Sequence, residues 1–196
     1  MEPDKAAVSI KSPHERMVEY REMAKQGPSH APEEQQRIAG QLAGEFRAEN
    51  DPLIRAQIVR TLSKFRVGEA DGVLRDAMED SSLDVRIAAC QVWGDCGSPE
   101  AVELLGRRIA SDTNTDVRLA AARALGETRD QAAVAKLGVA LDDSDPALQY
   151  RAVLSLRRLT GENLGNDVNR WRQYVKGEPI APVEPISIAE RLRQMF

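Results

Sequence analysis

Asp84-Val85-Arg86-Ile87-Ala88-Ala89 is followed, 32 residues later, by the near copy Asp116-Val117-Arg118-Leu119-Ala120-Ala121. A period of this length is typical of a stack of similar units and not of one globular core. The chain has 196 residues, which leaves room for about four such units. The repeat therefore predicts the fold class before any other feature of the chain is considered.

Each unit is predicted to contain two helices joined by a short turn, as the stretch from Ser98 to Thr128 shows. Ser98-Pro99 is typical of an N-cap and a first helical residue. Apolar residues at helical spacing follow in two stripes: Ala101, Val102, Leu104, Leu105 and Ile109, then Val117, Ala121, Ala124 and Leu125. Neither stripe can be buried within its own helix pair, so stacking on neighbouring pairs must bury it.

The same pattern predicts further units over 32–65, 69–96 and 130–159. The capping box Ser12-Pro13-His14-Glu15 predicts a helix to about Gln26 that caps the N-terminal end. A helix over 167–176 is expected to cap the other end. The sequence thus predicts an all-α, right-handed α-solenoid of about four helical hairpins with capping helices at both ends, spanning 12–176.

Three segments are expected to lie outside the stack. Residues 1–11 are interpreted as a disordered N-terminal arm and 177–185 as a Pro-rich linker. The pattern over 186–196 predicts an amphipathic helix with Ile188, Leu192, Met195 and Phe196. A helix this short is not stable alone in water, so it should dock on its own stack, another copy or a partner. Self-association through this helix is therefore one expectation.

Composition narrows the classes of partner. Lys and Arg total 27 against 31 Asp and Glu, a net charge of −4 that does not favour nucleic acid. The start MEPDKAAVSIK lacks the apolar region of a signal peptide, and no stretch approaches a membrane span of ~18 apolar residues. A cytoplasmic protein without membrane contact is expected, with export left open if a leader was removed. Cys90 and Cys96 are interpreted as reduced structural thiols.

The units resemble HEAT repeats, in the short form that is also found in bilin lyases. The shared motif is a turn Asp, then Val-Arg, then an Ala-rich second helix that ends in Leu-Gly. Its members here are Asp112, Val117-Arg118, Ala120 to Ala122 and Leu125-Gly126 in one unit, and Asp80, Val85-Arg86, Ala88-Ala89 and Trp93-Gly94 in another.

The resemblance implies that each turn Asp and the Arg six positions later bond along the stack. Asp80, Arg86, Asp112 and Arg118 would then form a structural ladder, with Glu49 and Arg55 as a variant pair. Gln149 occupies the Arg position of the last unit, so the ladder is expected to break or shift there.

Residues for catalysis or for holding a cofactor are scarce. His14 and His30 are the only histidines, and neither has a second ligand at metal spacing. Deoxyhypusine hydroxylases resemble this stack but need several His-Glu pairs for iron, whereas this chain has one. No Gly-rich phosphate loop is present, since Gly161 to Asn166 follows no strand. We therefore predict that the chain has no catalytic, cofactor-binding or metal-binding residue, no cofactor and no enzymatic activity.

HEAT-like DNA glycosylases are a second enzymatic possibility. They use a concave cleft rich in aromatic residues. Trp93 aligns with core positions and Trp171 lies on the terminal cap, so both are expected to be buried. An acidic chain without an aromatic cleft does not favour this class.

Basic and acidic residues are distributed unequally between the two helices of each unit. The second-helix segments 51–66, 81–96, 113–128 and 144–160 hold ten basic and six acidic residues, and the first-helix segments hold five and eleven. HEAT-like stacks place second helices on the concave side, so a mildly basic groove is expected, which would bind an acidic protein or peptide. The residues singled out for partner binding are Arg60, Lys64, Arg123, Arg157 and Arg158.

The sequence therefore predicts a non-catalytic scaffold for protein–protein interaction. One alternative stays open from the resemblance: a bilin-lyase-like subunit of an enzyme that attaches a chromophore to a protein cysteine.

Overall fold

The computed structural model describes residues 11–65 and 67–180, and every regular element within these residues is helical. The elements are α1 (Pro13–Gln26), the 3-10 helix η1 (Gly27–Ser29), α2 (Pro32–Ala48), α3 (Pro52–Leu62), α4 (Gly68–Met78), α5 (Leu83–Cys96), α6 (Pro99–Ser111), α7 (Thr115–Leu125), α8 (Ala132–Leu141), α9 (Pro146–Thr160) and α10 (Val168–Lys176). The predicted N-terminal arm, apart from Lys11, and the predicted helix over 186–196 lie outside the described residues, as does most of the Pro-rich linker.

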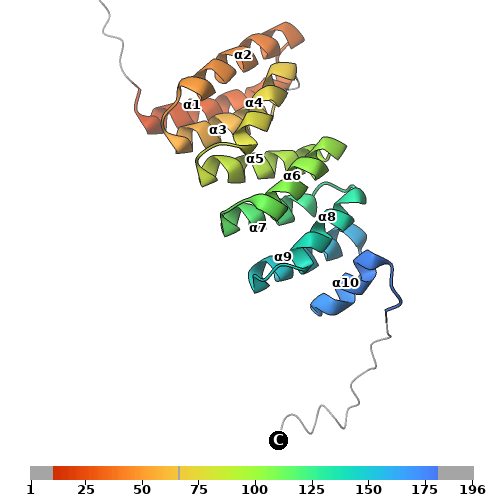
Figure 1. Ribbon diagram of the computed structural model, residues 1–196. Helices are drawn as coiled ribbons and strands as arrows, with labels where there is room; N and C mark the ends of the chain where they lie inside the picture. The colour runs from red at the N-terminus through yellow and green to blue at the C-terminus, as the bar shows by residue number, and fades with distance from the viewer. Residues whose placement is uncertain (1–10, 66, 181–196) are drawn as a thin grey trace, which may run out of the picture.

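The helices form two layers (Figure 1). In one, which we call the second-helix layer, α1, α3, α5, α7 and α9 pack side by side in this order. The other contains α2, α4, α6, α8 and α10, and we call it the first-helix layer. The two caps therefore differ, because α1 is a second helix without a first, and α10 is a first helix without a second.

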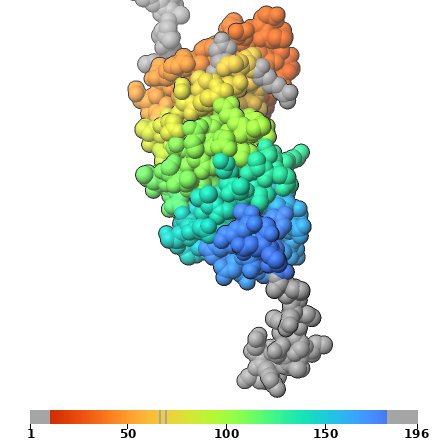
Figure 2. Space-filling model, turned by 45° about the vertical axis from the view of Figure 1, so that its right-hand side comes forward, coloured from red at the N-terminus to blue at the C-terminus, as the bar shows by residue number. Residues whose placement is uncertain are grey.

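Neighbours in sequence are also neighbours in space. The units follow one another in chain order from one end of the body to the other (Figure 2). Each hairpin therefore buries its apolar stripes against the hairpins before and after it, as in a solenoid. The predicted all-α stack of four helical hairpins is confirmed. No described helix has the length and apolar character needed to cross a membrane.

Local signals in the sequence place the helix ends. The Ser12 hydroxyl accepts the Glu15 N–H at 3.3 Å, and the Glu15 carboxylate accepts the Ser12 N–H at 2.7 Å, so the predicted capping box is present. Other helices begin after a side-chain cap from Asp51, Ser98 or Asn114. Each cap satisfies an N–H that has no partner within its helix.

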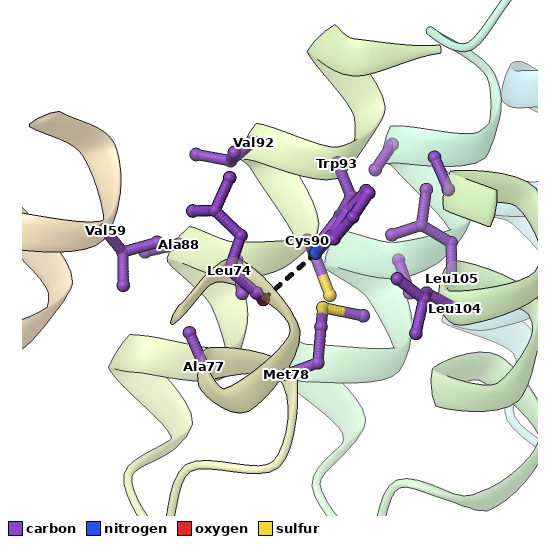
Figure 3. Close-up of a cluster of buried hydrophobic side chains, with 14 of the residues drawn as sticks. Val59, Leu74, Ala77, Met78, Ala88, Cys90, Val92, Trp93, Leu104 and Leu105 are labelled. Carbon is purple, nitrogen blue, oxygen red and sulfur yellow. Dashed lines mark hydrogen bonds between the residues drawn. The ribbon is translucent and has the colours of Figure 1, made fainter. Parts of the chain in front are cut away.

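The core is continuous between units, and Trp93 lies at its centre (Figure 3). Its side chain is only 4 % exposed, packs near Met78 and Cys90, and donates from Nε1 to the Leu74 carbonyl at 3.1 Å. Trp171 is fully buried and donates to the Gly165 carbonyl at 2.9 Å. The prediction that both tryptophans are buried is confirmed, and neither can line an open aromatic cleft.

Candidate interaction surface

Arginines near the N-terminal ends of the second-helix layer join successive units. Arg55 donates from Nε and Nη2 to the Asp80 carboxylate at 2.9 and 2.8 Å. Arg86 donates in the same two-point manner to Asp112 at 2.9 and 3.1 Å. The row is completed by the ion pairs Arg16–Glu49 and Arg118–Asp143. We call these four pairs the ladder.

The ladder is offset by one unit from the pairing that the motif suggested. Within its own turn, Arg86 donates only to the backbone carbonyls of Asp80 and Ser81. Its ion pair is with Asp112 in the next turn. Likewise, the Glu49 carboxylate forms an ion pair with Arg16, while Arg55 donates a hydrogen bond to the Glu49 backbone carbonyl. The sequence reasoning missed Arg16 and Asp143 as members.

A simple spacing rule would have found all four pairs. Each acid stands two residues before the N-cap of a second-layer helix, and each arginine stands four residues after one. The acid accepts the N-cap N–H as well, at 2.8 Å for Ser82 N to Asp80 and 3.0 Å for Asn114 N to Asp112. Each acid thus fixes the start of the second-layer helix that follows it and forms an ion pair with the preceding helix of the same layer.

Burial alone would raise the pKa of Asp112, but the Arg86 hydrogen bonds, the Asn114 N–H and the charge of Arg108 together lower it. The Asp112 and Arg86 side chains are 2 % and 13 % exposed. Four of the five N–H donors of Arg86 are used in such contacts, which leaves at most one for a ligand. The ladder is therefore structural.

The row ends at Gln149, as its position predicted. Its Nε2 donates to the Asp143 carbonyl at 2.6 Å, which preserves the contact with its own turn. No second helix follows α10 within the described residues, so the helix start that positions the carboxylate in the other units is not seen there.

The five residues proposed for partner binding do not share one environment. Arg60 and Lys64 line a pocket of about 480 Å³ between α1 and α3. Arg123 and Arg158 both bond to Glu127, at 3.4 and 3.2 Å. They lie in the second-helix layer too, but one carboxylate partly neutralises the two charges.

Arg157 serves a local role. Its Nη2 donates to the Gly165 carbonyl and to Asn166 Oδ1, both at 3.0 Å, and its buried Nε has no hydrogen-bond partner in the structure. These contacts hold the loop between α9 and α10. Arg157 is thus oriented toward this loop and not toward an open groove.

The basic character of the face is interrupted at its centre. A pocket of about 1140 Å³ near the C-terminal ends of α3 and α5 is lined by Lys64 but also by Asp71 and Asp95. Cys96 lines it as well, and burial together with these two carboxylates raises the pKa of its thiol. The face therefore has a basic patch near α1 and α3, an acidic centre, and a mixed patch near α7 and α9.

The fold and the ladder define a helical-repeat solenoid, and comparison with known families agrees. The family model of HEAT repeats matches residues 41–118 and 107–166. The chain belongs to the HEAT-repeat family. No curated protein matches it in sequence.

Among solved structures, human deoxyhypusine hydroxylase in complex with glycerol is similar at 26 % sequence identity and a TM-score of 0.56. The similarity covers 63 % of this chain and 44 % of that protein. The chain thus matches less than half the length of this relative. The similarity to bilin lyases stays a prediction.

This comparison corrects the expectation that the chain is not an enzyme. That expectation is wrong, because an enzyme shares the repeat fold and a quarter of the aligned residues. That the chain has only one His-Glu pair, His14-Glu15, does not justify excluding catalysis. Within 11–65 and 67–180, no group of three or more His, Cys, Asp or Glu residues could hold a metal ion.

Proposed function

We propose that the chain is a protein-interaction scaffold whose second-helix layer binds an acidic surface of a partner protein. One observation supports this most directly. Arg21, Arg60 and Lys64 cluster in one pocket without a hydrogen bond or ion pair to any described residue, while the ladder arginines are all paired. Unpaired cations around a hollow attract anionic groups and accelerate their association.

The architecture favours a macromolecular ligand. Stacked hairpins offer a long surface to which every helix contributes exposed side chains, and such surfaces suit extended contacts with another chain. The two larger hollows lie along the edge where the second-layer helices end, and one of them extends to α2 and α4 of the other layer. They meet at Asp95, and Lys64 links one of them to the α1–α3 pocket. A partner could therefore follow the face across several units.

Charge reversal on the two layers tests the proposal. The variant Arg60→Glu/Arg158→Glu changes two exposed residues of the second-helix layer, and Arg107→Glu changes an exposed residue of α6 in the other layer. Proteins captured by the wild type should be acidic at the contact, and binding measured with the purified partner should weaken about tenfold only in the double variant. Equal weakening by Arg107→Glu would reject the second-helix layer as the binding face.

A further inference from the structure

The pocket between α1 and α3 has an unusual lining for a surface hollow. Four of its residues are cationic, one is acidic, and the rest are Val18, Ala24 and Gln57. Lys25 is tied to Glu22 at 2.7 Å, which cancels that pair of charges. The remaining positive charge comes from the cations named above, Arg21, Arg60 and Lys64.

Arg60 is the cation most involved with the pocket wall. Burial of its stem lowers the pKa of the guanidinium, Asp84 opposes this effect, and Arg21 adds to it. An arginine stays charged in proteins, so Arg60 keeps its charge beside the like charge of Arg21, and the nearby Asp84 attracts it without forming an ion pair. An anion placed between Arg21 and Arg60 would relieve this repulsion.

Gln57 offers a polar group to a ligand in the pocket. Its side chain is 7 % exposed, yet it lines the pocket. Its only hydrogen bond within the described residues runs from Nε2 to Thr61 Oγ1 at 3.5 Å, the outer limit for such a bond. That hydroxyl already lies within donating distance of the Tyr20 and Gln57 carbonyls. The Gln57 Oε1 accepts no hydrogen bond from a described residue, so it can accept one from a ligand in the pocket.

The size of the cationic area limits the ligand. Asp84 lies near Arg60, and Asp95 and Asp71 line the next hollow along the face. A long polyanion such as nucleic acid would meet these carboxylates after a short distance, whereas a short acidic peptide would not. The pocket also offers no aromatic side chain on which a base could stack.

We propose that this pocket binds a short acidic peptide segment of a partner protein. Arg21, Arg60 and Lys64 hold its carboxylates, and the side-chain amide of Gln57 pairs with its backbone. The proposal rests on the proposed function and deepens it, because it places the main contact at the N-terminal end of the face and names the ligand chemistry.

The test uses the full chain and peptides selected from a random 12-residue display library. The selected peptides should be enriched in Asp and Glu, and titration calorimetry of the strongest one should show binding that weakens with salt. Arg60→Glu should raise its Kd about tenfold, while the matched reversal Arg158→Glu should change it less than about twofold. Gln57→Leu should raise the Kd about threefold. If the Gln57 variant does not fold, the double variant Arg21→Glu/Lys64→Glu, which changes two exposed residues, tests the pocket in its place.

The outcomes separate this inference from the proposed function. If Arg158→Glu weakens binding and the pocket variants do not, the pocket is rejected and the scaffold function stands. If the selected peptides lack carboxylates and bind every charge-reversal variant as tightly as the wild type, both proposals are rejected. If a single-stranded oligonucleotide displaces the peptide at lower concentration, or if Arg60→Glu dissolves a dimer of the chain, the pocket has a different occupant and the inference is overturned.

Discussion

Arg86 donates two hydrogen bonds to the carboxylate of Asp112, 26 residues further along the chain, and so ties α5 to the turn before α7. Asp112 also accepts from Asn114 N and lies 3.5 Å from Arg108. We expect Asp112→Ala to lower the free energy of unfolding by about 3 kcal/mol, because it leaves two arginines and an N–H without their acceptor. Urea denaturation measures the change.

Glu103→Ala serves as the matched control. It removes another inter-unit ion pair, with Lys136 at 2.8 Å, but Glu103 is 64 % exposed. The expected loss is at most about 0.5 kcal/mol, since water screens the pair. Equal losses in the two variants would contradict the structural role assigned to the ladder.

The ladder also predicts a dependence of stability on pH. Burial raises the pKa of Asp80 and of Asp112, but hydrogen bonds and the neighbouring arginines lower each below its ordinary value. A lowered folded pKa stabilises the fold fully above the unfolded pKa of about 3.9, and this contribution disappears as the pH falls through the folded pKa. The free energy of unfolding should therefore decrease below about pH 4, and less steeply in Asp80→Asn/Asp112→Asn. An unchanged slope would exclude these two carboxylates as the source.

Two opposite substitutions test where the ladder ends. Arg118→Gln removes a charged pair with Asp143 and should cost about 2 kcal/mol. Gln149→Arg installs the motif residue where no described second helix follows to position an acid, and should change stability by less than about 0.5 kcal/mol. A clear stabilisation by Gln149→Arg would show that a carboxylate after α10, such as Glu178, completes the row.

Close contact between second-layer helices depends on glycine. A Cβ on Gly94 would lie 2.9 Å from Ala124 Cβ and 3.0 Å from Ala124 Cα, so Gly94→Ala should cost about 2 kcal/mol by forcing α5 and α7 apart. Gly44 in α2 has open space around it, and Gly44→Ala should stabilise the helix by about 0.5 kcal/mol. Melting curves of both variants give the comparison, and a tolerated Gly94→Ala would disprove the close packing.

The two thiols should react differently. Burial raises the pKa of Cys90 to about 12, whereas Cys96 is exposed at the end of α5. A thiol reagent should therefore modify one cysteine in the folded chain and two in denaturant, because only the thiolate reacts and it must be accessible. Loss of the native reaction in Cys96→Ser would confirm which one reacts, and its persistence would contradict the assignment.

Much of the site lay beyond sequence reasoning. The basic bias of the second helices placed Arg60 and Lys64 correctly in that layer, but it could not show that Glu127 binds Arg123 and Arg158. It also missed Gln57, since an uncharged residue on an apolar helix face gives no signal of its own.

The period of the Asp-Val-Arg stretch, the apolar stripes and the capping residues were enough to predict the stacked hairpins and most helix ends. The stripes and the caps depend on residues within about one or two helical turns of one another, and the period is the recurrence of such a local pattern, so all three can be read from the chain alone. The partner of each ladder arginine and the cations left unpaired were decided only by the tertiary structure. Those pairings join residues 25 to 33 apart in sequence, such as Arg55 with Asp80 and Arg16 with Glu49, and they depend on how one hairpin packs on the next.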